Sequence, residues 1–316
     1  MRYHPSHLKR FHDRPVHDYE PGGDGRRRPL PEPDAVAWRV GASWEQPFEP
    51  LWRSFLDEVR SEDVTALVIG LWWEEWDEHG ITPVLDLLLA AVDRFPRLRA
   101  LFLADVESEE SEISWIRQGD LSVVLRAWPG LVELGVRGGT ELRLEPLRHD
   151  RLRTLRVESG GLPAEPVRAL ASCSFPALNS LELWLGTSAY GASSTVADVK
   201  ALLDAVGRCP GLRHLGLKNS EMQDAVAAAV AEAPVVAGLT SLDLGMGTLG
   251  DAGGGALLSG QPLTHLRHLG LRHHFMGEET AERLRAGLEP HGVAVDLTPA
   301  DARPYRQGRR YVAVGE

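Results

Sequence analysis

The chain has 316 residues, and its 34 lysine and arginine residues stand against 45 aspartate and glutamate residues, giving a formal net charge of −11. This acidic balance argues against nucleic acid as the main partner, because contacts with phosphates require a basic surface. No apolar run approaches the roughly 18 residues of a membrane span, and Met1 to Arg28 lack the apolar stretch of a secretory signal. The two cysteines, Cys173 and Cys209, are too few for a disulfide framework or a thiolate metal site. We therefore expect a cytoplasmic protein.

The first predicted elements follow a segment, residues 1–30, that is rich in arginine, histidine and glycine and that we expect to be flexible. Residues 35–40 have the pattern of a strand. Residues 48–59 have apolar side chains at helical spacing, which predicts a helix. Residues 31–62 are therefore expected to form an N-terminal cap.

Residues 63–292 repeat one pattern, Leu-x-x-Leu-x-Leu, in which valine can replace the last leucine. Clear copies begin at Leu98, Leu131, Leu152, Leu178, Leu212, Leu239 and Leu266. Proline stands two residues before four of these leucines, and it ends the preceding helix because it lacks an amide hydrogen and clashes with the previous turn. The segments between copies have helical spacing over 83–95, 113–128, 166–173, 196–209, 224–233 and 278–288. Each repeat is therefore predicted to be a helix followed by a short strand and a loop.

Residues 293–299 are predicted to contain the last strand, and residues 300–316 a C-terminal tail in which 311–314 could form one more short strand. Residues between the leucines are often polar, as in Thr154, Arg156 and Glu158. Parallel strands that are covered on both faces are apolar throughout, so one face of this sheet must contact water. The pattern predicts a single α/β leucine-rich-repeat solenoid over residues 31–299, a horseshoe with a parallel sheet inside and helices outside.

The repeat at 239–258 resembles the ribonuclease-inhibitor-like class of leucine-rich repeats. The whole chain is similar to a family of uncharacterised actinobacterial leucine-rich-repeat proteins. The sequence segments that carry this similarity are 113–116, 136–139 and 157–163. This resemblance implies the solenoid fold over about residues 30–300 and brings no activity with it. The asparagine that usually follows each strand is replaced here, for example by Gly139 and His274.

Two loops are unusual in composition. Trp72, Trp73 and Trp76 are interleaved with acidic residues after one strand, and residues 105–112 form an acidic run after the next. Both loops leave the same edge of the predicted sheet. They are expected to be either a solvated acidic rim or a patch that binds a basic partner through tryptophan anchors.

The wet face of the sheet is the main candidate for binding another protein, because it mixes charges of both signs with aromatic rings. Together with the two loops, the predicted partner-binding residues are Trp72, Trp73, Trp76, Phe102, Asp105, Arg137, Arg156, Glu158, Glu182, Trp184, Lys218, Asp243 and Arg272. The expected function is a non-enzymatic protein-interaction scaffold that binds neither nucleic acid nor membrane.

No catalytic residue, cofactor or metal site is predicted. The motif Gly245-x-Gly247-x-x-Gly250 has the spacing of a dinucleotide fingerprint, but a half-wet sheet contradicts the fold which that motif requires. The alternative to a scaffold is an accessory subunit or enzyme of a biosynthetic pathway, with a small-molecule site near Trp184 and Tyr190.

Overall fold

The computed structural model describes residues 5–22, 29–43, 46–73, 80–301 and 308–316. Within these residues one twelve-stranded sheet runs through the whole molecule, and its strand order follows the sequence. The strands are β1 (Arg10–Phe11), β2 (Arg14–Asp18), β3 (Ala37–Val40), β4 (Ala66–Ile69), β5 (Ala100–Leu103), β6 (Glu133–Arg137), β7 (Thr154–Glu158), β8 (Ser180–Gly186), β9 (His214–Ser220), β10 (Ser241–Asp243), β11 (His268–Gly270) and β12 (Ala294–Asp296). The pair β1–β2 is antiparallel, and from β2 to β12 every neighbouring pair is parallel.

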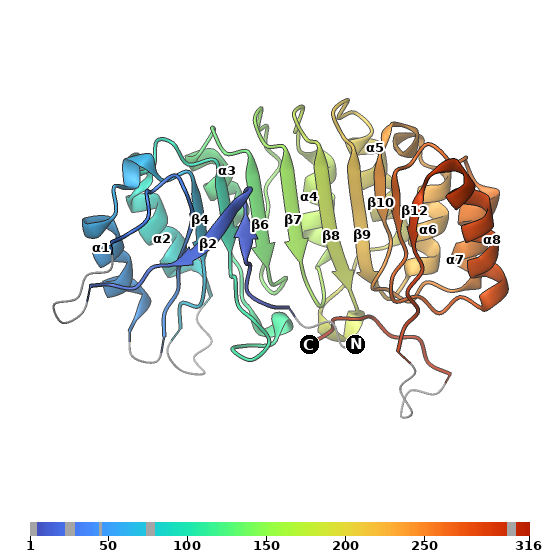
Figure 1. Cartoon of the computed structure of the whole chain (residues 1–316), viewed down its shortest axis with the longest axis horizontal. Coiled ribbons are helices and arrows are strands. Elements are labelled where there is room, and N and C mark those ends of the chain that lie inside the picture. Colours follow the sequence, from blue (N-terminus) through green and yellow to red (C-terminus); the bar gives the residue numbers. More distant parts are fainter. Residues whose placement is uncertain (1–4, 23–28, 44–45, 74–79, 302–307) are drawn as a thin grey trace.

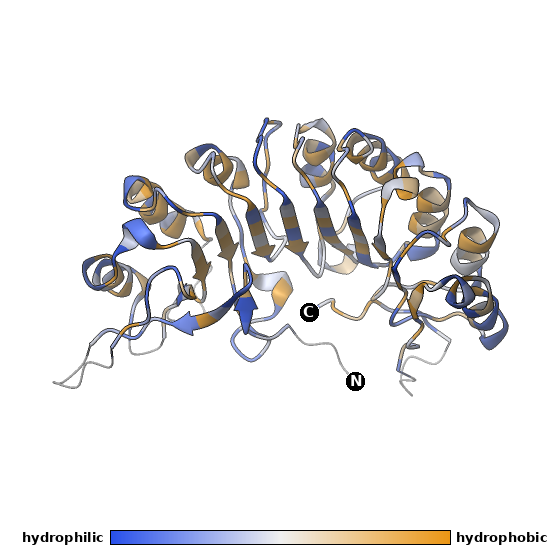
Figure 2. Cartoon of the chain, turned by 45° about the horizontal axis from the view of Figure 1, so that its top comes forward, coloured by the Kyte–Doolittle hydropathy of each residue, from blue (hydrophilic) through white to orange (hydrophobic). Residues whose placement is uncertain are grey.

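The helices lie on the outer side of this curved sheet (Figures 1 and 2). They are α1 (Phe48–Glu58), α2 (Thr82–Ala90), α3 (Leu121–Ala127), α4 (Ala164–Ser172), α5 (Val196–Val206), α6 (Gln223–Glu232), α7 (Asp251–Ser259) and α8 (Glu278–Leu288). The predicted leucine-rich-repeat solenoid is therefore confirmed as the fold. None of the helices in the described residues is both long and apolar enough to cross a bilayer.

The core is a ladder of leucines that pair across neighbouring strands. The second leucine of each copy aligns in register with its counterpart in the next strand, and each is at most 3% exposed: Leu101, Leu134, Leu155, Leu181, Leu215, Leu242 and Leu269. A single repeat could not bury these side chains alone, so the repeats stabilise one another along the stack. The core thus runs continuously between the sheet and the outer helices.

Several predicted helices are shorter than the sequence pattern, most clearly the one over residues 113–128. Residues 113–128 form a short 3-10 turn at Ile113–Trp115 and then α3, which begins only after Asp120. The carboxylate of Asp120 accepts a hydrogen bond from the amide of Ser122, so it caps the helix at this point. A capping box of Thr195 and Asp198 likewise begins α5.

Both tails fold back onto the solenoid. Residues 10–18, which we expected to be flexible, instead form the hairpin β1–β2, and β2 adds to the sheet beside β3. The hairpin crosses the inner side of the arch (Figure 1). Residues 311–314, offered above as an additional strand, form no regular element because their backbone bonds to loops and side chains instead.

Candidate functional site

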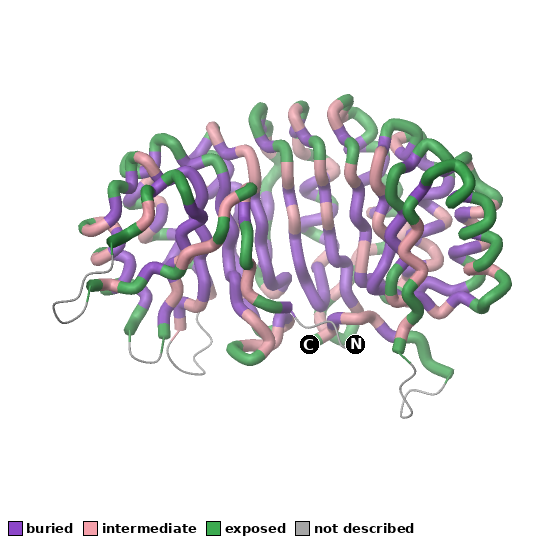
Figure 3. Tube along the Cα trace, viewed as in Figure 1, coloured by how far each residue is buried: buried purple, intermediate pink, exposed green. Residues whose placement is uncertain are grey.

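The inner face of the sheet is divided into an apolar half and a polar half. One row of inward-facing residues begins with Ala66 and Ala100 on β4 and β5 and continues with Glu133 and Thr154 on β6 and β7. The row then runs through Ser180, His214, Ser241 and His268. The strands β4 and β5 are buried at every position, whereas β7 to β12 retain partly exposed inner residues (Figure 3).

The N-terminal hairpin covers the apolar half. Phe11 packs its ring edge-on against Phe102 with centroids 5.8 Å apart, inside a small cluster that includes Val68. The backbone amide of Leu8 donates to both carboxylate oxygens of Asp105, each at 3.1 Å. Strands β4 and β5 are therefore buried on both faces, and the predicted wet face is confined to the remaining strands.

Seven of the predicted residues form a chain of charges that alternate in sign across the sheet. Their order is Asp105, Arg137, Glu158, Arg156, Glu182, Lys218 and Asp243. The nitrogen–oxygen distances include 2.8 Å for Arg137 with Glu158 and 3.0 Å for Lys218 with Asp243. Because each charge has neighbours of opposite sign, the chain is nearly neutral in spite of its many ionised groups.

We call this row of seven alternating charges the charge ladder. One end of it is buried and the other end is open to solvent. Asp105, Arg137 and Glu158 are at most 3% exposed, and Arg137 also donates to the carbonyl oxygens of Val106 and Ser6. Asp105 and Arg137, both predicted to contact a partner, bond to Leu8 and Ser6 of the N-terminal segment, and Glu158 bonds to Arg137. Burial raises the pKa of Asp105, although Arg137, the Leu8 amide and Arg39 oppose that shift.

Two of the predicted aromatic residues are also buried. Phe102 and Trp184 are each 1% exposed. The Phe102 ring lies under the hairpin and over Gly135, where a Cβ atom would approach the ring to 2.2 Å. The indole of Trp184 donates to Glu182 and lies 5.8 Å from the Lys218 ammonium. Both rings are therefore covered in this structure, and the partner contact predicted for them stays a prediction.

The open end of the ladder retains Arg156, Glu182, Lys218 and Asp243, and Arg272 lies beyond it as an exposed side chain. Burial opposes ionisation of Glu182, but the His214 ring, 3.7 Å away, and the charges of Lys218 and Arg156 outweigh it. The pKa of this carboxyl therefore lies far below its usual range. The low pKa favours the ionised form of Glu182, which has no proton to donate.

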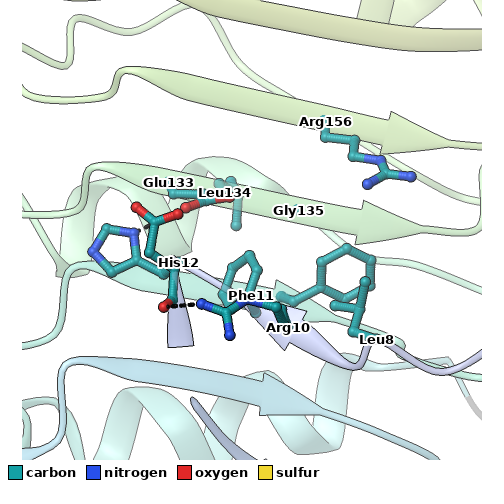
Figure 4. Close-up of a pocket in the computed structure, with 10 residues that line it drawn as sticks. Leu8, Arg10, Phe11, His12, Glu133, Leu134, Gly135 and Arg156 are labelled. Atoms are coloured by element: carbon teal, nitrogen blue, oxygen red, sulfur yellow. Dashed lines mark hydrogen bonds and ion pairs between the residues drawn. The ribbon is translucent and has the colours of Figure 1, made fainter. Parts of the chain in front are cut away.

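A pocket of about 270 Å³ lies where the hairpin ends and the open face begins (Figure 4). Phe11, Phe102 and Leu8 give it apolar walls, and Arg156 lies at its far side. His12 bonds to the carboxylate of Glu133 at 2.9 Å, which connects the hairpin to β6. The pocket thus combines apolar surface with charged groups at its rim.

The tryptophan-rich loop and the acidic run at 105–112 make different contacts in the structure. Trp72 is 8% exposed and belongs to the core, and Trp73 meets it edge-on with ring centroids 4.7 Å apart. Trp76 lies outside the described residues. In the acidic run, Glu110 bonds to His7 at 2.7 Å, so the N-terminal segment supplies a basic partner from the same chain. This hydrogen bond raises the pKa of His7 against the opposing effect of burial.

The alternative small-molecule site near Trp184 and Tyr190 is filled by the C-terminal tail. The Tyr190 hydroxyl donates to the Glu316 carboxylate, and Gly315 lies against the tyrosine ring. The glycine motif at 245–250 also has a packing role. A Cβ atom at Gly245 would lie 2.8 Å from the carbonyl of Arg272, and one at Gly247 would lie 2.3 Å from Gln223.

Leu8, Phe11 and His12 are the residues of this site that sequence reasoning missed. The sequence indicates these three residues only indirectly, through the composition of the strands that they cover. Residues 66–69 and 100–103 read Ala-Leu-Val-Ile and Ala-Leu-Phe-Leu, without the polar alternation of later strands. Such strands are typical of a sheet that is covered on both faces, so a cover for this half was predictable although its identity was not.

No family model matches the chain, and no curated protein matches it. Among solved structures, a structural-genomics crystal structure of a protein from Bacteroides fragilis superposes with a TM-score of 0.79 and 26% sequence identity. The match covers 88% of this chain and 77% of that one. The complex of TLR13 with ssRNA13 has a TM-score of 0.40 and 15% identity, over 80% of this chain and 35% of that one, which is too loose a superposition to support an inference. These similarities concern the fold.

Proposed function

We propose that this protein is a non-enzymatic scaffold that binds another protein through the open half of its inner face, over β7 to β12. The supporting observation is the charge ladder, whose exposed end presents Arg156, Glu182, Lys218 and Asp243 to the solvent in a fixed arrangement. Preorganised charges of both signs favour recognition of a complementary pattern rather than bulk attraction. The low pKa of Glu182 further supports binding over acid–base chemistry.

In this proposal the pocket beside the hairpin receives an anchoring side chain of the partner. Its walls of Phe11, Phe102 and Leu8 suit an apolar group, and its volume of about 270 Å³ is sufficient for one large side chain. Interfaces commonly gain most of their affinity from a few such buried anchors surrounded by polar contacts. The ladder would then supply the polar contacts.

The cytoplasmic location, the ribonuclease-inhibitor-like repeat type and the kinship with actinobacterial leucine-rich-repeat proteins belong to the same proposal. The C-terminal tail packs against Tyr190, so the structure gives no support to the alternative of a small-molecule site there.

Site-specific photo-crosslinking tests the proposal in a lysate of the organism that encodes the chain. A photoreactive phenylalanine analogue replaces Arg272 on the open face or, as a matched control, the exposed Arg283 on outer helix α8. We expect one protein to be crosslinked from position 272 and not from position 283. Identical crosslinking patterns from both positions would contradict the assignment of the inner face.

A further inference from the structure

Three successive repeats share an uncommon backbone conformation at the edge where the strands end. Asn219 is the penultimate residue of β9, and Met246 and His273 lie in the loops after β10 and β11. The three residues are spaced at intervals of 27, and their φ angles are 56°, 69° and 62°. Residues other than glycine rarely adopt this left-handed conformation, and such residues cluster at binding sites. All three lie under the C-terminal tail.

Each of these residues bonds to the backbone of the tail. His273 bonds through Nε2 to the carbonyl of Tyr311 at 2.9 Å, and the Met246 carbonyl accepts from the amide of Ala313 at 2.7 Å. Asn219, which is fully buried, donates to the carbonyl of Val314 at 2.6 Å and accepts from its amide at 3.0 Å. The loops thus hold an extended peptide by its main chain, which is independent of peptide sequence.

Side-chain contacts add selectivity. Tyr311 packs edge-on against His273 and Phe275, with ring centroids 5.2 Å away in both cases, and it is 6% exposed. Val314 is 2% exposed within the main core cluster. Before the tyrosine, Arg310 bonds to the carboxylate of Asp224 at 2.5 Å. The tail therefore makes these contacts through a basic residue, an aromatic residue and, three positions after the aromatic one, a valine.

Glycines at both ends of the groove leave room for the tail. A Cβ atom at Gly160 would lie 2.0 Å from the carbonyl oxygen of Gly315, and one at Gly250 would lie 2.2 Å from the Arg310 guanidinium. Gly160 is not in the left-handed region, so its lack of a side chain serves close approach. These two positions therefore shape the loop edge to a peptide that crosses it.

We propose that this loop edge is a peptide-binding groove, separate from the inner face, which residues 310–316 occupy as an internal ligand. Its external ligand is an extended segment of a partner protein with the pattern Arg-Tyr-x-x-Val, which displaces the tail. Competition for the groove follows, because the tail and the ligand use the same Asn219 amide and the same aromatic cluster.

Fluorescence polarisation with a labelled peptide of residues 309–316 tests the groove in the full-length chain. The substitution Val314→Asp puts a carboxylate at a buried position and should release the tail from the groove. We expect this variant to bind the peptide about tenfold or more tightly than the wild-type chain, because the internal competitor is gone. The matched control Val312→Asp alters a half-buried neighbour and should bind like the wild type.

A second substitution assigns the binding to the groove. Asn219→Asp in the Val314→Asp chain keeps the acceptor but loses the amide donor, so the peptide affinity should fall about tenfold or more. Circular dichroism and thermal melting establish that each variant is folded. A folded Val314→Asp chain that binds no peptide at about 1 mM, or binds no more tightly than the wild type, or is insensitive to Asn219→Asp, would overturn the proposal.

Discussion

Arg137 illustrates how a single charged residue organises this molecule. Its guanidinium lies between Glu158 and Asp105 and reaches the carbonyl of Ser6, yet its side chain is 3% exposed. The sequence correctly indicated an arginine on the inner face, but it could not indicate that a distant N-terminal segment removes its water. Charge reversal at this position would therefore unfold the site rather than test a partner contact.

Removing this charge should be strongly destabilising. Arg137→Met removes one cationic partner from each of two buried carboxylates, Asp105 and Glu158, which keep Arg39 and Arg156, and we expect urea denaturation to show a loss of about 1.5–3 kcal/mol in unfolding free energy. The control Arg272→Met removes an exposed arginine and should change it by no more than about 0.5 kcal/mol. Equal effects of the two substitutions would show that the buried network does not form.

His274 takes the place of the asparagine that usually follows a strand in these repeats, and it is 4% exposed. Its Nε2 bonds to the carbonyl of Leu297, and its Nδ1 accepts from the amide of Met276, so only the neutral ring satisfies both partners. Burial lowers the pKa of His274 below its ordinary value of 6.5. The unfolded chain therefore takes up this proton more readily than the folded chain.

It follows that the contribution of His274 to stability is complete above pH 6.5 and declines as the pH falls through its folded pKa. We expect the unfolding free energy of His274→Asn, which cannot be protonated, to depend less on pH between about 7 and 5 than that of the wild type. Parallel pH profiles for the two proteins would contradict this role.

Among the elements, the N-terminal hairpin decides which part of the inner face is exposed to solvent. It converts an apolar strip on β4 and β5 from an exposed patch into a second, smaller core. The hairpin is held by the pairing of β2 with β3 and, over the apolar strip, by the ring pair Phe11–Phe102. Local detachment without global unfolding is therefore a property that we expect of this element.

Phe11→Ala tests that expectation. The substitution leaves a cavity against Phe102 and should weaken docking of the hairpin, so hydrogen exchange should accelerate at residues 8–18. The amides of β9 and β10, far along the stack, should keep their wild-type protection. Uniform acceleration over all strands would show that the hairpin unfolds only with the whole molecule.

At the scale of the whole molecule, leucine spacing was enough to predict the solenoid, its helices outside and its parallel sheet inside. The ladder from Leu101 to Leu269 has the predicted register because each repeat carries its own core positions. Tail positions lack such periodicity. The contacts of Leu8 with Asp105 and of Val314 with Asn219 join residues about 100 positions apart, and one sequence alone does not encode such pairs as a pattern.

Leu155 lies in the middle of this ladder and is 3% exposed. Leu155→Ala should lower the unfolding free energy by roughly 2–5 kcal/mol, because it opens a cavity between two neighbouring repeats. Chemical denaturation followed by circular dichroism measures this change. A loss well below about 1 kcal/mol would show that the repeats do not stabilise one another through the leucine ladder.

The division of the inner face into a covered and an open half is most directly tested by thiol labelling. Ala100 and Ser241 occupy the same inward row of the sheet, the first under the hairpin and the second on the open half. Each is replaced by cysteine in a chain in which Cys173 and Cys209 are serine, and the reaction with a chromogenic disulfide is timed. We predict that the cysteine at 241 reacts about a hundredfold or more faster than that at 100, since the latter reacts only when the hairpin opens. Equal rates at the two positions would contradict the covered half and, with it, the restriction of the partner surface to β7–β12.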